Sequence, residues 1–209
     1  MPASNTLENL WNKIRWTIYL PIYDWIAGIF APWRKQSIEQ LNLNPNDKIL
    51  ISGAGSGLDL PFLKEAKSIA AVDITPAMLY LLRKKANKLH LNVDSRTMDA
   101  MKLEFPDDHF DAVILHLILA VIPDPVKCLK EAERVLKPGG KIAVFDKFVP
   151  EGEKSGLLRE FLNFFLKILA TSVNRDINEI VKHTNLQKEK DRPAAWSGLF
   201  RLILLKKPT

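Results

Sequence analysis

Between residues 48 and 147, short apolar runs alternate with longer amphipathic segments, and this alternation is the feature that most constrains the fold. The apolar runs are of the length and type expected for buried strands. Strands separated by helices of about 9–13 residues predict βαβ units with right-handed crossovers and a parallel sheet. The five predicted strands of this section are Lys48–Ser52, Ser68–Asp73, Asn92–Thr97, Phe110–His116 and Lys141–Asp146.

The segments between these strands carry helix signals. Thr75 followed by Pro76 has the features of a helix N-cap and first turn. The Pro-Gly-Gly sequence within 137–140 predicts a stop and a turn before the fifth strand. We expect helices over Leu58–Ala66, Pro76–Lys88 and Asp124–Leu136.

Two further strands are predicted near the C-terminus. Leu186–Asp191 and Leu199–Lys206 are joined by a loop around Pro193, which is typical of an antiparallel hairpin. The sequence therefore predicts a Rossmann-like α/β fold: a seven-stranded, mostly parallel sheet with a C-terminal antiparallel hairpin and helices on both faces. We expect an N-terminal amphipathic helical cap over residues 1–41 and this domain over residues 42–209.

A glycine-rich loop, Ser52–Gly57, lies between the first predicted strand and the next helix. Glycine permits the sharp turn and lets a ligand come close to the backbone. N–H groups at such a turn can also face polar ligand atoms. A loop of this kind also occurs as a tight turn without any ligand, so the loop alone does not define a site.

Aspartates that follow successive strands strengthen the prediction. Asp73 ends the second strand, where a carboxylate can accept hydrogen bonds from both ribose hydroxyls. Asp99, with Ala100, follows the third strand, where it can accept from an adenine amino group. Each aspartate alone is more typical of a loop or cap. The glycine loop with Asp73 also suits a nicotinamide oxidoreductase, but the loop spacing and Asp99 disfavour that alternative.

Four segments in this order resemble the successive motifs of the class I S-adenosylmethionine-dependent methyltransferases: "ILISGAGSGLDLPFL", "AVDITPAML", "MDAMKLEFPDDHFDAVIL" and "VLKPGGKIAVFD". The resemblance covers nearly all of the chain and implies S-adenosylmethionine as cofactor. The chain departs from the family at Ile51, where an acidic residue is usual and helps to fix the amino group of the cofactor.

The resemblance also implies roles for individual residues. The loop would line the methionine part of the cofactor, Asp73 would hold the ribose, and Ile74 would pack on the adenine. Asp99 and Ala100 would bind the adenine edge, and His116 would face the methyl group or its acceptor. The implied cofactor-binding residues are Gly53, Ala54, Gly55, Gly57, Asp73, Ile74, Met78, Asp99, Ala100 and His116.

Within this class, three softer motifs resemble phosphatidylethanolamine N-methyltransferases and the ubiquinone/menaquinone-type enzymes: "YDWIAGIFAPWRKQSI", "LHLILAVIPDP" and "GLFRLILL". This resemblance implies a lipid-like acceptor, with the amine of phosphatidylethanolamine first and C- or O-methylation of a quinone or other small molecule as the alternative. It also implies that Tyr23 closes over the cofactor, which makes Tyr23 and His116 the candidate catalytic residues.

His116 is the candidate base. An alkylammonium acceptor must lose a proton before it can attack the methyl carbon, and a histidine can accept that proton directly or through water. The alternative is that His116 is a strand-end residue with a packing role. His109 is expected to be a turn residue. No His, Asp and Glu have the spacing of a metal site, so we expect no metal.

The N-terminal segment is rich in aromatic residues, with four of the five tryptophans in the first 33 positions. These side chains could cover the cofactor cleft, lie at a membrane surface or contact a partner protein. The proline-interrupted stretch from Trp16 to Trp33 is too short for a confident membrane span, and we expect none. Leu157–Ala170 is a second apolar helix, expected either in the core or as a lid over the acceptor.

The formal charge of +6 lies mainly outside the central section, because residues 147–209 carry 12 basic and seven acidic side chains. This is compatible with an anionic lipid surface or with an ordinary solvated face. The basic residues are too diffuse for a nucleic-acid site. With its single cysteine and no secretory signal, the chain is expected to be cytoplasmic, with peripheral contact at the inner face of the membrane. A non-catalytic cofactor-binding protein is the alternative from another class.

Overall fold

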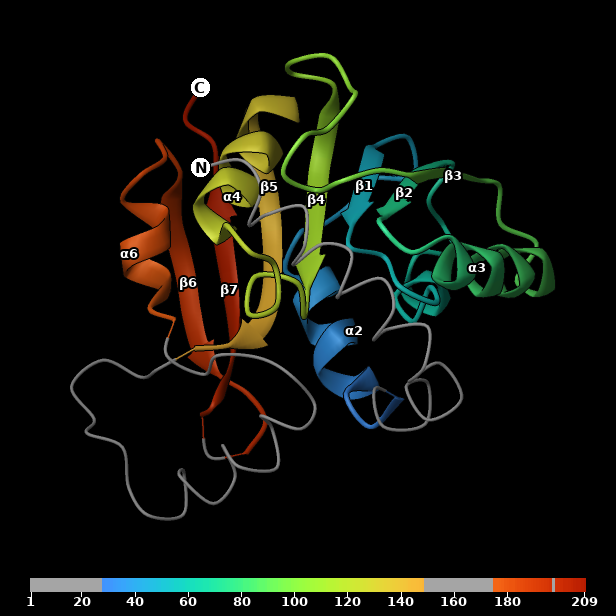
Figure 1. Ribbon diagram of the computed structural model, residues 1–209, viewed down its shortest axis with the longest axis horizontal. Helices are drawn as coiled ribbons and strands as arrows, with labels where there is room; N and C mark the ends of the chain where they lie inside the picture. The colour runs from blue at the N-terminus through green and yellow to red at the C-terminus, as the bar shows by residue number, and fades with distance from the viewer. Residues whose placement is uncertain (1–27, 149–174, 197) are drawn as a thin grey trace.

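A computed structural model describes residues 28–148, 175–196 and 198–209. Within these residues the chain forms one seven-stranded sheet with the strand order β3-β2-β1-β4-β5-β7-β6 (Figure 1). The strands are β1 (Lys48–Ser52), β2 (Ser68–Asp73), β3 (Val93–Thr97), β4 (Phe110–His116), β5 (Leu136–Lys147), β6 (Gln187–Pro193) and β7 (Phe200–Lys206).

Strands β1 to β5 are parallel, and β7 pairs antiparallel with both β5 and β6. The predicted sheet, with its parallel body and terminal antiparallel hairpin, is confirmed. The order places β1 between β2 and β4: the chain adds β2 and β3 on one side of β1 and then β4 on its other side. The strand order therefore switches between β1 and β4. In open α/β sheets a ligand binds beside the carboxyl ends of the strands at such a point.

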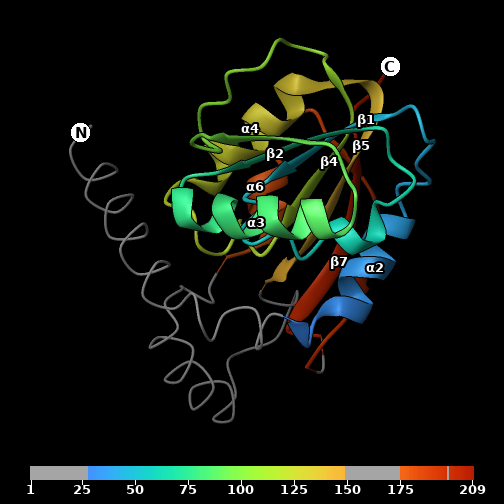
Figure 2. The same ribbon diagram turned by 90° about the vertical axis from the view of Figure 1, so that its right-hand side faces the viewer.

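Helices cover both faces of the sheet, as the sequence predicts (Figure 2). Side chains of α2 and α3 pack on one face, in the buried cluster that contains Ile49, Ile51 and Ile114. Side chains of α4 and α6 pack on the other, in the cluster that contains Leu50 and Val113. The helices are α2 (Ala31–Glu39), α3 (Pro76–Lys88), α4 (Pro125–Val135) and α6 (Ile177–Val181).

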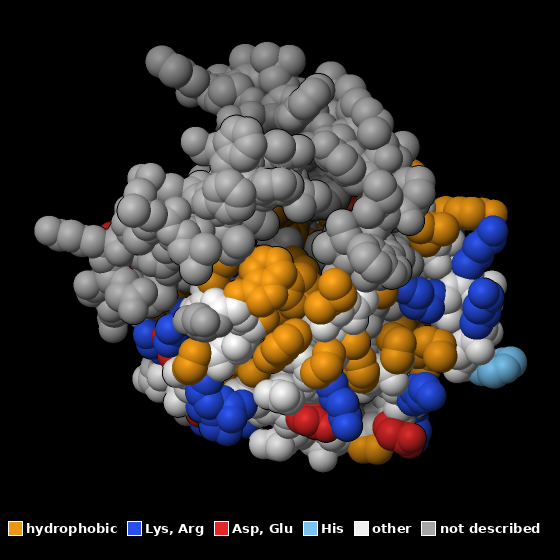
Figure 3. Space-filling model, turned by 90° about the horizontal axis from the view of Figure 1, so that it is seen from below, with side chains coloured by type: hydrophobic (Ala, Val, Ile, Leu, Met, Phe, Trp, Pro, Cys, Tyr) orange, Lys and Arg blue, Asp and Glu red, His pale blue; other side chains and the backbone are white. Residues whose placement is uncertain are grey.

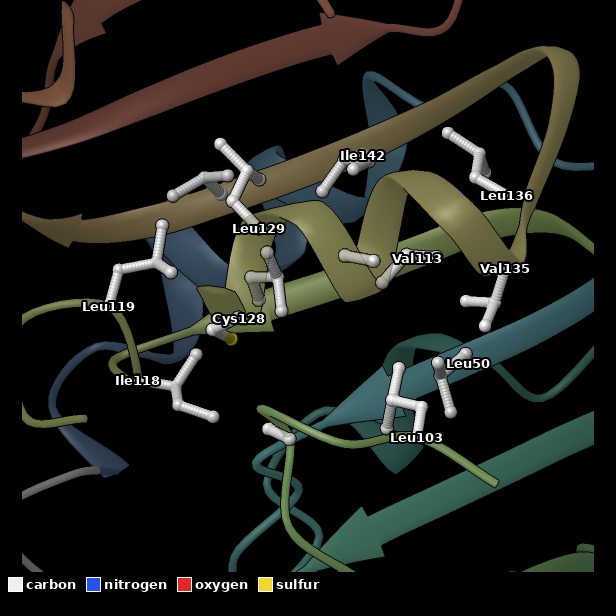
Figure 4. Packing of buried hydrophobic residues seen from close by; sticks show 14 of the residues in the cluster. Leu50, Leu103, Val113, Ile118, Leu119, Cys128, Leu129, Val135, Leu136 and Ile142 are labelled. Atoms are coloured by element: carbon white, nitrogen blue, oxygen red, sulfur yellow. The ribbon is translucent and has the colours of Figure 1, made fainter. Parts of the chain in front are cut away.

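The alternation of side chains along the strands explains these two layers. Leu50 points to the α4 face, whereas its neighbours Ile49 and Ile51 point to the α2 face. Figure 4 shows Leu129 and Val135 of α4 packed over Val113 and the other apolar side chains of that face. Because these strands are buried on both faces, they read as continuous apolar runs in the sequence.

The predicted helix over Leu58–Ala66 is wrong. A single 3-10 turn, η1 (Leu60–Phe62), occupies that segment. Pro61 has no N–H to continue an α-helical ladder. In addition, the segment turns the side chain of Asp59 inward, where it is buried at 2% exposure.

Two boundaries differ from the predictions in smaller ways. Strand β5 begins at Leu136, not Lys141, because Gly139 N–H donates to Lys207 and Gly140 accepts from the N–H of Lys207. The predicted turn is thus an irregular start of the strand, with Gly139 at φ +77°. Thr75 does precede α3, but its side chain makes no capping hydrogen bond. Asp124 caps α4 by accepting from the N–H of Lys127 at 2.9 Å.

Tyr23, the apolar segment Leu157–Ala170 and most of the expected N-terminal cap lie outside the described residues, so the predictions for them and the domain boundary stay predictions. The part of the expected cap that is described, α2, packs directly on the sheet. None of the helices in the described ranges has the length and apolar character needed to cross a bilayer.

Candidate cofactor and active site

The predicted site residues meet at one edge of the sheet. β1, β2, β3 and β4 are parallel neighbours, so Ser52, Asp73 and His116 all lie at the carboxyl ends of their strands. Asp99 follows β3 on the same edge. The sheet topology therefore brings together segments that are far apart in the sequence.

The loop after β1 has the backbone that its glycines predict. Gly53, Gly55 and Gly57 have φ values of +74°, +53° and +79°, in the left-handed region that favours glycine. A Cβ atom at Gly53 would lie 2.4 Å from Cδ1 of Ile118. At Gly57 it would lie 3.3 Å from Cα of Leu82. The loop can therefore follow this path only with small residues.

The sequence predicts that N–H groups of this loop face polar ligand atoms, but in the structure they donate to acceptors within the protein. Gly53 and Ala54 both donate to the carbonyl of Val72 at 2.9 Å, and Gly57 donates to Ala54 at 3.0 Å. Gly55 donates to the carboxylate of Asp73 at 2.8 Å. These four N–H groups already have acceptors within the protein. The loop would therefore contribute to ligand binding mainly by the close approach that its glycines allow, rather than by free N–H donors.

Asp73 is the partly exposed carboxylate next to this loop. One oxygen accepts from Gly55 N–H and the other from Thr75 N–H, each at 2.8 Å. Burial raises the pKa of Asp73, and the hydrogen bonds from Thr75 and Gly55 oppose the rise. Each carboxylate oxygen has more than one acceptor position, so the group can still accept from ribose hydroxyls. Its placement agrees with the predicted role.

The residues assigned to the adenine lie around the same edge. Ile74 is partly exposed after β2, and Met78 is buried on the first turns of α3. Asp99 is partly exposed and accepts from Met101 N–H at 2.8 Å, while Ala100 is buried beside it. The four residues lie after neighbouring strands, but their contacts with a nucleoside stay predictions.

Ser52 adds a polar atom that the sequence did not single out. Its side chain is 1% exposed at the carboxyl end of β1, and its Oγ has no hydrogen-bond partner among the described residues. A buried polar atom without a partner is costly, which favours a ligand or water there. Ser52, Asp73 and the glycine contour together fit a polar nucleoside such as S-adenosylmethionine.

His116 does not lie open in the site. Its Nδ1 lies 2.7 Å from Oδ1 of Asp59, and its Nε2 lies 2.9 Å from Oγ of Ser37. The imidazole side chain has an exposed fraction of 0%. Burial lowers the pKa of His116, although Asp59 opposes the shift. In this arrangement both ring nitrogens are occupied, so the proposed role of His116 as base is not supported by its geometry.

Arg34 completes a buried polar cluster with these three residues. Its Nη1 lies 2.9 and 3.0 Å from the two oxygens of Asp59, and both side chains are at most 4% exposed. Burial alone would raise the pKa of Asp59, but Arg34 and His116 hold it well below its ordinary value. Sequence reasoning missed Arg34, Ser37 and Asp59. The one available signal was Asp59, a single acidic residue within the apolar segment 58–63; Arg34 and Ser37 lie in a segment of mostly polar residues.

Ile51, the position where the related motif usually has an acid, is 1% exposed within the apolar cluster under α2. A carboxylate there would lie among apolar side chains. In this chain the buried carboxylate on the α2 face of the sheet is Asp59.

The family model described as a methyltransferase domain matches residues 50–144, which run from β1 through β5. A 2-phytyl-1,4-naphtoquinone methyltransferase of Synechococcus elongatus is 33% identical over 176 residues, covering 78% of this chain and 72% of that protein. The chain therefore belongs to the class I S-adenosylmethionine-dependent methyltransferases: it is a methyltransferase, and its cofactor is S-adenosylmethionine.

More particularly, the chain is similar to a phosphatidylethanolamine N-methyltransferase of Cereibacter sphaeroides, with 26% identity over 192 residues. That match covers 90% of this chain and 92% of the relative. Among solved structures, the fold matches an Aquifex aeolicus SAM-dependent methyltransferase with a TM-score of 0.60 and 21% identity, covering 83% of this chain and 88% of the other. It also matches the [4+2]-cyclase SpnF with a TM-score of 0.74 and 16% identity, covering 86% and 81%. These structural likenesses show the fold.

Proposed function

We propose that this methyltransferase transfers the methyl group to the amine of phosphatidylethanolamine at a membrane surface. The observation that carries the proposal is the likeness to the Cereibacter sphaeroides enzyme, which extends over nine-tenths of both chains. The quinone methyltransferase of Synechococcus elongatus has a higher sequence identity to this chain, but the match extends over 72% of its own length. Its 33% identity keeps quinone methylation as the second candidate.

The exposed apolar side chains support a membrane acceptor. Of the described residues, three large hydrophobic side chains are exposed: Ile29 (55%), Trp196 (49%) and Tyr80 on α3 (53%). The ring of Trp196 packs against the buried ring of Phe30, with 5.7 Å between the two centroids. Trp196 also has a φ of +53°, a costly conformation for a bulky residue. An aromatic side chain held outward in this way suits the interface of a bilayer.

The charges near this apolar end favour an anionic surface. Arg192 and Arg201 lie at this end of β6 and β7, whereas Lys206 and Lys207 lie at the opposite end, beside Lys141 and Gly140 of β5. Figure 3 views the molecule from the end where the parallel strands finish, and apolar side chains gather there with Lys and Arg side chains and a few acidic ones around them. The acceptor would thus reach the carboxyl edge of the sheet from the membrane side.

Methyl transfer requires little of the protein beyond the alignment of the amine with the methyl group. S-adenosylmethionine supplies an activated methyl group. The residues of the carboxyl edge hold the nucleoside, and a closed apolar site excludes water. The amine must be deprotonated to attack, and its ordinary pKa is about 10. Because His116 is enclosed, we infer that this proton leaves to solvent before the amine enters the site.

The test uses methyl-labelled S-adenosylmethionine with vesicles of phosphatidylethanolamine, and matched vesicles of phosphatidylcholine that contain a demethylated prenyl quinol. We expect label in N-methylated phosphatidylethanolamine, at a rate that rises with pH above 7. Label in the quinol alone would replace the proposal with the second candidate. Label confined to water-soluble products of a total cell extract would refute a lipid acceptor.

A further inference from the structure

The buried cluster of Arg34, Ser37, Asp59 and His116 joins three separate parts of the chain. Arg34 and Ser37 come from α2, Asp59 lies two residues after the glycine loop, and His116 ends β4. Asp59 and His116 are 57 residues apart in sequence, and Ser37 and His116 are 79 residues apart. The cluster therefore fixes the position of the loop relative to a helix and a neighbouring strand.

The donors and acceptors of the cluster define a single arrangement. An ionised carboxylate can only accept, so the proton between Asp59 and His116 lies on Nδ1 of the imidazole. Nε2 is then an acceptor, and the hydroxyl of Ser37 donates to it. Arg34 donates to both oxygens of Asp59 and supplies the compensating charge. Every one of these contacts is satisfied with a neutral imidazole.

The order Ser37, His116, Asp59 matches the contacts of a hydrolytic triad, but access differs. The residues Ser37, His116 and Asp59 have exposed fractions of 0%, 4% and 2%. No carbonyl carbon can approach a serine hydroxyl that is enclosed in this way. The cluster is therefore structural in its chemistry, and its effect on function must pass through the segments that it holds.

One of those segments touches the cofactor loop directly. His116 is followed by Leu117, which has a left-handed φ of +58° and donates its N–H to Phe145 at 2.8 Å. This strained residue turns the chain so that Ile118 packs on Gly53, in the space that a Cβ would fill. The position of His116 thus determines where Ile118 supports the loop.

We propose that Asp59 is a positioning residue: it fixes the tautomer and place of His116, and through Leu117 and Ile118 it holds the glycine loop in the shape that binds the cofactor. Asp59 lies on the same face of the sheet as Ile51, the position at which the related motif usually has its acid. The carboxylate behind the loop is therefore supplied in this chain from a residue eight positions later.

The test compares Asp59→Asn with Asp94→Asn in the full chain. Asp94 also pairs with an arginine, Arg96 at 2.6 Å, but on the exposed strand β3. S-adenosylhomocysteine is the calorimetric probe, and ¹⁵N NMR of His116 reports its tautomer. In Asp59→Asn we expect His116 to lose its Nδ1–H preference and the Kd for S-adenosylhomocysteine to rise about tenfold. Asp94→Asn should leave both readouts unchanged.

A folded Asp59→Asn protein with the wild-type tautomer, or with a Kd within about twofold of wild type, would overturn the proposal. If Asp59→Asn does not fold, Ser37→Ala tests the same claim while it keeps the Arg34–Asp59 pair. We expect that variant to change the Nε2 resonance of His116 and to weaken cofactor binding by about threefold. If neither the Nε2 resonance nor the cofactor affinity changes, the proposal is refuted. No acceptor is present in these measurements, so their outcome is independent of the proposed lipid substrate.

Discussion

Asp73 and Asp59 are two carboxylates at the same edge of the sheet, and the protein treats them in opposite ways. Asp73 is partly exposed and accepts backbone N–H groups from Gly55 and Thr75. Asp59 is buried and is paired with Arg34 and His116. The pKa of Asp73 is raised by burial, whereas the neighbouring Arg34 and His116 hold the pKa of Asp59 well below its ordinary value despite its burial.

The two carboxylates therefore have different expected roles: Asp73 binds the cofactor, whereas Asp59 stabilises the protein around the site. In the described part of the chain no lysine or arginine forms an ion pair with Asp73, so its charge remains available to the hydroxyls of a ribose. The acceptor capacity of Asp59 is used inside the protein. We therefore expect substitutions at Asp59 to reduce stability first, and substitutions at Asp73 to reduce cofactor binding first.

The largest expected effect on stability is that of Asp59→Ala. The change leaves the Arg34 guanidinium buried without its carboxylate, and breaking a buried pair in this way costs about 3–5 kcal/mol. Urea unfolding at pH 7 measures the loss. A loss below about 1 kcal/mol would mean that Asp59 is no more important to folding than an exposed aspartate.

Asp146 sharpens the comparison, because it is a fully buried carboxylate that accepts N–H groups from Ala120 and Lys147 at 3.0 and 2.8 Å. Burial raises its pKa to about 6. A raised folded-state pKa stabilises the fold at low pH, and this contribution is lost as pH rises from about 4 to about 6. Relative to Asp146→Asn, wild type should lose about 2 kcal/mol of unfolding free energy over that range. Parallel pH profiles for the two proteins would contradict this expectation.

Gly53→Ala tests whether the loop contour itself matters. The new Cβ would occupy a left-handed backbone position and meet Ile118, at an expected cost of about 1–3 kcal/mol. Cofactor affinity should fall together with the melting temperature, because the loop and its support must both move. Gly28→Ala is the matched control, since nothing lies within 4 Å of a Cβ there. A Gly53→Ala protein with wild-type melting temperature would show that the loop adapts without strain.

The smallest effect is expected for Asp94→Ala, which removes an exposed ion pair with Arg96. Both side chains are about half exposed, so solvent screens the interaction and the loss should be under about 0.5 kcal/mol. Thermal unfolding in low and high salt measures it. A loss as large as that of Asp59→Ala would remove the contrast between buried and exposed pairs.

The sequence predicts the cofactor half of this site better than its support, for a physical reason. β1, its glycine loop and Asp73 form one local strand–turn–strand pattern, so their chemistry is readable from spacing. The Arg34–Asp59 contact joins residues 25 positions apart, and His116 contacts Asp59 from the end of β4. No periodicity relates such positions. Sequence analysis therefore identified His116 but gave it the role of an open base, which its enclosure does not support.

The local sequence pattern also gave one wrong prediction, the helix over Leu58–Ala66. The segment after the glycine loop has the composition of a helix, but the inward turn of Asp59 and the missing N–H of Pro61 leave a 3-10 turn. Tertiary contacts at Asp59 therefore decide both the backbone of that segment and the environment of His116.

The most direct measurement is calorimetric titration of S-adenosylhomocysteine into the wild-type protein and into Asp73→Ala. The wild-type protein should bind, and the folded variant should bind about 100-fold more weakly, because two hydrogen bonds to the ribose are lost. Its unfolding temperature should also fall, because the N–H groups of Gly55 and Thr75 lose their acceptor. Equal affinity of the two proteins, or no binding by the folded wild type, would contradict the assignment of the cofactor site to this edge of the sheet.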